Sequence, residues 1–132
     1  MLMARGIELS YGASLCLRGV DLVAEPGRIT CVLGRNGVGK TTMIRILLGL
    51  DSATRGSTAL LGQDSQALTS QTKARVGYVA EGHHLIQAYR VKRLIQLCRS
   101  LSPTWNEAFF DHLLKTFRLP LDRRVKALSA GM

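Results

Sequence analysis

Apolar and polar residues alternate along the first part of the chain, and this pattern predicts strands. Residues 7–11 and 14–28 alternate with a period of two, and the second segment closes at Pro26-Gly27, a pair typical of turns. We expect these segments to form a small antiparallel sheet. Residues 29–33, ITCVL, are instead apolar and rich in β-branched side chains without strict alternation, which is typical of a strand buried on both faces.

Two shorter segments, 57–62 and 75–80, are predicted as further strands, and a helical pattern separates them from the first group. A helix is expected from Gly39, and Gly49 is a plausible residue to end it because glycine accommodates the left-handed conformation that follows many helices. The broad apolar side of this helix consists of Met43, Ile44, Ile46, Leu47 and Leu48.

Strands give way to helices near residue 81. A helix that ends before Pro103 is expected there, because apolar side chains recur at i, i+3, i+4 and i+7 in Leu94, Leu97, Cys98 and Leu101. Thr104 and Glu107 have the spacing of a capping box, which predicts Thr104 as the N-cap of a second helix that Pro120 ends. The apolar face of this second helix, interpreted as core, consists of Phe109, Phe110, Leu113, Leu114 and Phe117.

The chain carries a net charge of +9, and the excess lies in its second half. Residues 73–132 hold 11 Lys and Arg against 4 Asp and Glu, counted along the sequence. This balance fits a site for a polyanion or a solvated helical face, and we favour the solvated face. Free thiols in a reducing compartment are expected, because Cys16, Cys31 and Cys98 form no C-x-x-C pair. Neither a transmembrane span nor a secretory signal is expected.

Residues 34–41, GRNGVGKT, match the phosphate-binding pattern G-x-x-x-x-G-K-[ST] without a gap. Glycines let the backbone turn its amides toward an anion, and the start of a helix adds a partial positive charge. Lys40 is expected to reach the β- and γ-phosphates of a nucleotide, Thr41 to bind Mg²⁺, and Thr42 to approach the α-phosphate. The predicted phosphate-binding residues are Gly34, Arg35, Asn36, Gly37, Val38, Gly39, Lys40, Thr41 and Thr42.

Taken together, this loop and three further segments make the chain resemble the ATP-binding subunit of ABC transporters. Tyr11, in LSYG, stands where the family has an aromatic residue that stacks on adenine, although by itself it is more typical of an ordinary strand. VGYVAE (76–81) resembles the Q-loop strand, and LSAGM (128–132) resembles the signature that is usually LSGGQ. The resemblance covers essentially the whole chain. Within the family, the chain is most similar to a bacterial, exporter-like branch that also has YVAE.

The resemblance implies an α/β fold, in which a P-loop NTPase core and a small antiparallel β-subdomain occupy residues 1–80 and a helical subdomain occupies residues 81–132. It implies ATP and Mg²⁺ as cofactors. Glu81, where the family usually has Gln, is expected near the metal or the attacking water, and the alternative is an exposed loop acid. Ser129 and Gly131 are expected to complete the ATP site of a second ATP-binding subunit in a head-to-tail dimer.

The sequence also departs from the family pattern. Ala130 and Met132 replace Gly and Gln of the signature, and the methyl group of Ala130 is expected to weaken contact with the γ-phosphate. The nine Asp and Glu residues include none at the end of an apolar strand, so the Walker B Asp, the catalytic Glu and the family's switch His are missing. We therefore expect a fold that is incomplete at the C-terminus, marginal stability, and inefficient ATP hydrolysis by this chain alone.

The predicted function is that of a subunit coupling ATP binding and hydrolysis to membrane transport. The resemblance implies a cytoplasmic subunit that a transmembrane partner holds at the inner face of the membrane. Residues near 81–100 are expected to contact this partner. Nucleic acid is not expected as a partner. Three alternatives remain: a soluble ABC-type ATPase acting on ribosomes or nucleic acid, another P-loop enzyme such as a nucleotide kinase, and a nucleotide-binding remnant without turnover.

Overall fold

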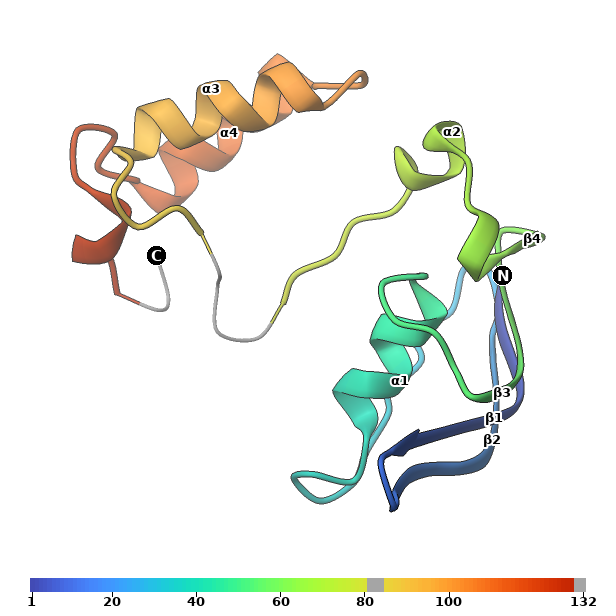
Figure 1. The fold of residues 1–132 in the computed structure, drawn as a ribbon. Coiled ribbons are helices and arrows are strands. Elements are labelled where there is room, and N and C mark those ends of the chain that lie inside the picture. The colour runs from blue at the N-terminus through green and yellow to red at the C-terminus, as the bar shows by residue number, and fades with distance from the viewer. Residues whose placement is uncertain (81–84, 130–132) are drawn as a thin grey trace. The chain divides into compact units, whose positions relative to one another are not determined.

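The computed structural model describes residues 1–80 and 85–129 of the chain (Figure 1). The chain divides into two compact units, Met1–Lys73 and Ala74–Met132. The first unit contains β1 (Leu2–Tyr11), β2 (Ser14–Ala24), α1 (Lys40–Leu47), β3 (Arg55–Leu60), β4 (Gln63–Asp64), the short 3-10 helix η1 (Ser65–Ala67) and α2 (Ser70–Lys73). The second contains α3 (Val91–Leu101), α4 (Glu107–Phe117) and the 3-10 helix η2 (Val125–Ala127). The domain division predicted between residues 80 and 81 adjoins residues outside the described set and stays a prediction.

The first unit is built on a four-stranded antiparallel sheet in the order β2-β1-β3-β4. β1 and β2 form a hairpin in which Tyr11 pairs with Ser14 across a two-residue turn, and Gly12 in that turn has a φ of +58°. Such positive φ values favour glycine in short hairpin turns. The antiparallel sheet predicted from the alternating segments is therefore confirmed.

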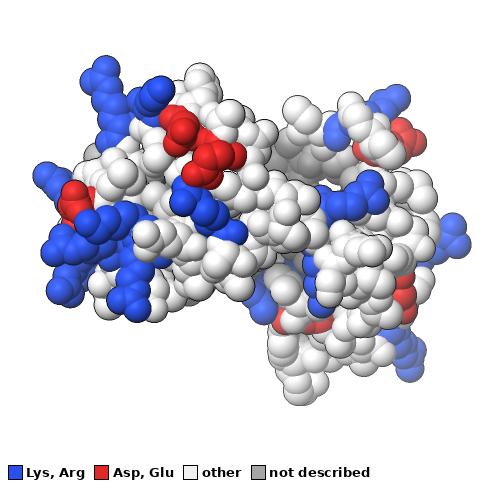
Figure 2. Space-filling model, turned by 90° about the horizontal axis from the view of Figure 1, so that it is seen from above, with Lys and Arg blue, Asp and Glu red and all other residues white. Residues whose placement is uncertain are grey.

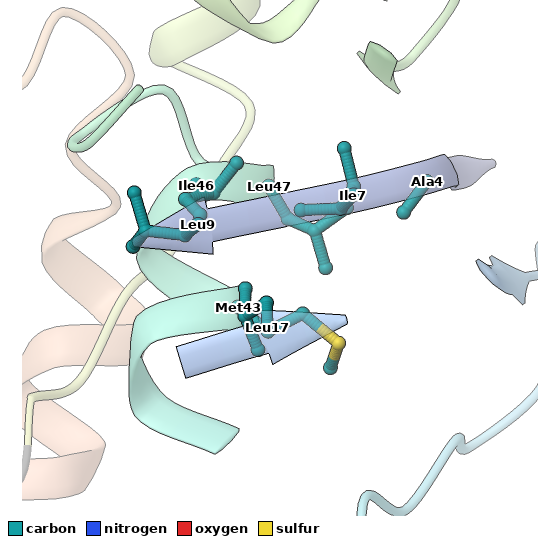
Figure 3. Close-up of a cluster of buried hydrophobic side chains, with 7 residues drawn as sticks. All are labelled: Ala4, Ile7, Leu9, Leu17, Met43, Ile46 and Leu47. Carbon is teal, nitrogen blue, oxygen red and sulfur yellow. The ribbon is translucent and has the colours of Figure 1, made fainter. Parts of the chain in front are cut away.

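The core of the first unit lies between this sheet and α1 (Figure 3). Alternate residues of β1 face α1, because side chains one position apart point to opposite faces of a strand, and Ile7 and Leu9 are buried while Glu8 and Ser10 are not. From α1, Met43, Ile46 and Leu47 are buried, which confirms the predicted apolar side in part. Ile44, also predicted on this side, is 38% exposed. The complete cluster consists of Ala4, Ile7, Leu9, Leu17, Met43, Ile46 and Leu47.

Two predicted strands are wrong. Residues 29–33 and 75–80 have no regular secondary structure, and Ile29 and Leu33 are 97% and 90% exposed. A strand exists only where a neighbour accepts and donates its backbone hydrogen bonds, and within residues 1–80 and 85–129 no strand pairs with either segment. Only Val32 of the first segment packs against the core cluster.

In the second unit, α3 and α4 confirm the two predicted helices, but the predicted cap of α4 is wrong. Asn106 is its N-cap, since the Asn106 side chain accepts a hydrogen bond from the Phe109 amide at 2.9 Å. Glu107 is therefore the first helical residue, and its carboxylate accepts hydrogen bonds from the Arg99 guanidinium and the Trp105 indole. No helix of the described part of the chain is long and apolar enough to cross a membrane.

The prediction that the aromatic residues of α4 belong to the core is also wrong. No residue of α4 is buried, and Phe109 and Phe117 are 58% and 60% exposed. Phe110 contacts the ring of Trp105, with the ring centroids 4.7 Å apart. The helical period correctly predicted an apolar face on α4, but periodicity alone does not show whether other residues bury that face.

The end of α1 is joined to the segment after it by an ion pair. The Arg45 guanidinium donates two hydrogen bonds to the Asp51 carboxylate, at 2.7 and 2.9 Å, and the Asp51 carbonyl accepts one from the Gln66 side chain at 2.9 Å. The hydrogen bonds from Arg45 lower the pKa of Asp51 below its ordinary value of 3.8. This forked geometry fixes the exit of the chain from α1 toward η1.

We predict that Ile46→Ala lowers the free energy of unfolding by about 2–4 kcal/mol, because it leaves a cavity in the core. Ile44→Ala is the matched control on the same helix, since Ile44 is 38% exposed, and it should cost less than about 1 kcal/mol. Urea unfolding followed by circular dichroism measures both values. Equal losses would show that α1 does not bury this face.

We predict that Asp51→Asn destabilises the chain by about 0.5 kcal/mol at neutral pH, a small value because the pair is partly exposed to solvent. The folded-state pKa is depressed, so this contribution is complete above the ordinary value of 3.8 and is lost as the pH falls through the folded-state pKa. Urea unfolding from pH 7 to pH 2.5 should therefore show the two curves converging in acid. Asp111→Asn is the control, and a constant difference at all pH values would contradict the assignment.

Candidate phosphate-binding site

A glycine-rich loop, residues 34–39, leads into α1 in the first unit. Gly37 and Gly39 have φ values of +79° and +99°, a conformation that side-chain-bearing residues rarely adopt. A Cβ atom on Gly34 would lie 3.0 Å from the Val38 Cγ1 atom, so glycine also permits a tight turn there. The sequence-predicted loop therefore has the backbone geometry that its glycines suggest.

Gly39 is held against β2. A Cβ atom at this position would lie 2.7 Å from the Leu17 Cδ2 atom and 3.4 Å from the carbonyl oxygen of Cys16. Leu17 is itself buried in the core, at 4% exposure, and cannot move aside freely. The start of α1 is thus fixed by Leu17 of β2, which precedes Gly39 by more than twenty residues.

The Lys40 side chain closes the loop from the inside. Its ammonium donates hydrogen bonds to the backbone carbonyls of Gly34 and Arg35, both at 2.8 Å. An ammonium group has three N–H donors, so one remains for a ligand. The positive charge is therefore tied to the backbone of the loop rather than extended away from it.

The first turn of α1 adds further donors and a favourable field. The amides of Lys40, Thr41 and Thr42 begin the helix, where the helix backbone supplies no acceptors. No acidic residue lies in this turn, so the positive end of the helix dipole is uncompensated. Thr41 is exposed, and its hydroxyl is available to a cation brought by a ligand. The described residues contain no group of three or more His, Cys, Asp or Glu that could hold a metal ion alone.

Tyr11 lies in the same open groove as the tip of the loop. The groove has a volume of about 560 Å³ and is lined by Tyr11 and residues of β2 together with Gly37 and Val38. Tyr11 is 60% exposed, so its ring is accessible to a planar group. Arg18 also lines the groove, and no acidic residue does. The structure therefore places Tyr11 and the loop tip in one groove, and the stacking role expected for Tyr11 stays a prediction.

Sequence analysis missed the residues of β2 at this site. Cys16 and Leu17 support Gly39, and Arg18 adds a positive charge to the groove, but none belongs to a recognisable motif. Only the pairing of β1 with β2 places them beside the loop, and no local sequence signal would have found them.

The remaining predicted site residues are not brought to the loop. Glu81 and Gly131 lie outside the described residues. Ser129 belongs to the second unit, where it follows η2 and is exposed. The roles expected for these three residues stay predictions.

The site and its sheet belong to a recognised class of protein. The family described as ABC transporter matches residues 17–132, which include the complete glycine-rich loop but not Tyr11. The chain therefore belongs to the ABC transporter family.

Curated relatives are ATP-binding proteins of transport systems. The chain is 38% identical over 127 residues to the lipoprotein-releasing system ATP-binding protein LolD of Alcanivorax borkumensis, covering 87% of this chain and 55% of that protein. It is 32% identical over 137 residues to the Nod factor export ATP-binding protein I of Cupriavidus metallidurans, covering 100% of this chain and 45% of that protein. The chain spans about half the length of these relatives.

Solved structures confirm the α/β fold that the resemblance implied. An ATP-binding subunit of an ABC transporter matches all of this chain and 57% of its own, with a TM-score of 0.83 and 25% identity. A dimeric bacterial ABC transporter cassette matches 99% of this chain and 64% of its own, with a TM-score of 0.79 and 19% identity.

We predict that Gly39→Ala destabilises the chain more than Gly37→Ala, by about 1 kcal/mol. Both substitutions strain a positive φ, but only the methyl group at position 39 would also meet another group, Leu17, since the space around Gly37 is open. Urea unfolding of the two variants measures the difference. Equal stabilities would show that β2 does not fix the start of α1.

Proposed function

We propose that the chain binds MgATP at residues 34–42 as part of an ATP-binding subunit of an ABC transporter. The observation that carries this proposal is the Lys40 ammonium, which is hydrogen bonded at 2.8 Å to two carbonyls of the glycine-rich loop. Together with the first-turn amides of α1 and the glycine backbone, this cation supplies the groups that a bound phosphate would require. The names of the curated relatives, which are ATP-binding proteins, support the same ligand.

Each part of the site would take a separate part of the nucleotide. The backbone amides from Gly37 to Lys40 would surround the β-phosphate, and Lys40 would exchange its carbonyl acceptors for β- and γ-phosphate oxygens. Thr42 would approach the α-phosphate. The ring of Tyr11 would stack on adenine, since it is exposed in the groove that also contains the loop tip.

The chain's own residues fit Mg²⁺ only together with a nucleotide. Thr41 offers one exposed hydroxyl in the first turn of α1, and Mg²⁺ commonly takes most of its other ligands from phosphates and water. Glu81 is proposed as a second oxygen ligand or as a contact of the attacking water. The metal would offset the charge of the phosphates and hold them in register with Lys40.

A second ATP-binding subunit and a transmembrane subunit are the proposed partners. Ser129 and Gly131 would contact the γ-phosphate held by the other subunit in a head-to-tail dimer. Support for a dimer comes from the related cassette whose solved structure is dimeric, and support for the membrane partner comes from the relatives' names as transport proteins. The proposed location is the cytoplasmic face of the membrane, through the transmembrane partner.

ATP hydrolysis coupled to transport is proposed for the whole subunit, not for these 132 residues alone. The sequence contains no apolar strand that ends in Asp-Glu, which would hold the metal and polarise water. Binding and hydrolysis are therefore separable in this chain, and they should be tested separately.

We predict that Lys40→Ala weakens MgATP binding by about tenfold or more, since a charged hydrogen bond to phosphate is lost. Isothermal titration calorimetry on the 132-residue chain measures the change. Lys115→Ala, an equal loss of charge on α4, is the control and should bind as the parent does. Unchanged binding by Lys40→Ala, or an equal loss in both variants, would contradict the proposed site.

Thr41→Ala refines the same experiment. It should remove most of the gain in affinity that Mg²⁺ gives and leave metal-free ATP binding almost unchanged, because only the metal ligand is lost.

A phosphate-release assay on the parent chain should give no turnover above background. Robust turnover that Lys40→Ala abolishes would overturn the proposal that this chain does not hydrolyse ATP efficiently.

A further inference from the structure

A second positively charged site lies in the second unit, where α3 begins. An open cavity of about 510 Å³ is lined by Ala88, Tyr89, Arg90, Lys92, Arg93, Gln96 and Arg124. Basic side chains gather over the left-hand part of the surface in Figure 2, which in Figure 1 carries α3 and α4. Its volume lies within the range of small-molecule sites, and it is open to solvent, since most of its lining residues are exposed.

The positive charge of this cavity exceeds the negative charge beside it. Lys92 is paired with Asp122 at 2.6 Å, and this pairing lowers the pKa of Asp122. Arg90 donates a hydrogen bond to the backbone carbonyl of Asp122 and not to its carboxylate. The Arg124 side chain has no hydrogen bond or ion pair among the residues that the structure describes. The cavity lining thus contains four cationic side chains and no acidic one, and the neighbouring Asp122 carboxylate is paired with only one of the four, Lys92.

The guanidinium of Arg93 is already held in place. It lies over the ring of Tyr89, 4.4 Å from the ring centroid. Stacking on an aromatic face leaves the edge of a guanidinium, with its N–H donors, free to form two parallel hydrogen bonds to an oxyanion. Less side-chain freedom is then lost when an anion binds.

The start of α3 is unusual in its charges. Its first turn contains Lys92 and Arg93 and no acidic residue, although the positive end of the helix dipole favours the opposite sign. The amides of Val91 and Lys92 donate to the carbonyls of Arg123 and Leu121, both at 3.0 Å, so the segment 121–124 already caps this helix. Side chains, and not the helix amides, would therefore bind the ligand.

We infer that this cavity is a binding site for a phosphate anion with more than one negative charge, held by Arg93 and Arg124. A phosphate monoester or pyrophosphate supplies the charge and the oxygen geometry that paired guanidinium forks require, whereas a single carboxylate leaves most of the positive charge unpaired. The ligand is either a soluble phosphate compound or the headgroup of an anionic phospholipid. This inference does not depend on the proposed function of the loop at residues 34–42.

Pyrophosphate binding to the 132-residue chain tests the inference, with Lys40→Ala as the background because the loop at residues 34–42 would also take phosphate. Arg93→Gln with Arg124→Gln removes two of the cavity's charges without altering Asp122 or Lys92. Lys73→Gln with Lys115→Gln is the matched control, since it removes the same charge from α2 and α4. Isothermal titration calorimetry should show binding in the Lys40→Ala background, retained by the control and weakened about tenfold or more by the cavity variant.

Vesicles distinguish the two sources. Stronger co-sedimentation with phosphatidic acid vesicles than with phosphatidylcholine vesicles, reduced by the cavity variant, assigns a lipid headgroup. Equal co-sedimentation together with cavity-dependent pyrophosphate binding assigns a soluble phosphate. Loss of all pyrophosphate binding in Lys40→Ala alone, or equal weakening by both double variants, would overturn the inference. Cavity-dependent binding of polyglutamate without pyrophosphate binding would also overturn it, in favour of an acidic protein partner.

Discussion

The contact between α1 and the β1–β2 hairpin determines the arrangement of the whole first unit. Met43, Ile46 and Leu47 of the helix enclose the core together with side chains of the two strands. The contact continues to the start of the helix, where Gly39 touches Leu17 closely enough to exclude a side chain. Hydrophobic burial and the conformation of the glycine-rich loop are therefore set by the same pair of elements. Any change that tilts α1 on the sheet will also move the backbone amides at its start.

Local patterns predicted the elements that are stabilised locally or by their immediate neighbours. The alternation of Ile7 and Leu9 with polar residues gave the strand, because one face of β1 is buried and the other is not. The prediction of strands at 29–33 and 75–80 was wrong because an apolar sequence is only compatible with a strand, and a strand also needs a neighbour to pair with. Asn106, and not the predicted Thr104, caps α4. Both side chains can cap a helix, and the backbone geometry that selects one of them cannot be deduced from the sequence.

The candidate site was predictable to a similar extent. The spacing of glycines before Lys40 has a direct physical meaning, and the structure has the matching backbone. The register of β1 against β2 brings Tyr11 to the tip of the loop, and the same register adds Cys16, Leu17 and Arg18, which carry no motif. A motif identifies the residues that contact a ligand directly. The residues that hold such a loop in place are brought there by strand pairing and carry no motif. The basic cavity at α3 likewise depends on the segment that contains Arg124 folding back onto the start of that helix.

The two hydrogen bonds that restrain Lys40 have a consequence for which anions the loop accepts. The carbonyls of Gly34 and Arg35 hold the ammonium at 2.8 Å and leave one N–H donor, so an oxyanion that took more than this donor would compete with them. A carbonyl is a weaker acceptor than a charged phosphate oxygen, and an ammonium gains more from the charged one. A singly charged anion would therefore contact the remaining donor alone, while a ligand with several charged oxygens would also displace the carbonyls. At the proposed site, these two hydrogen bonds would thus favour polyphosphates over singly charged anions.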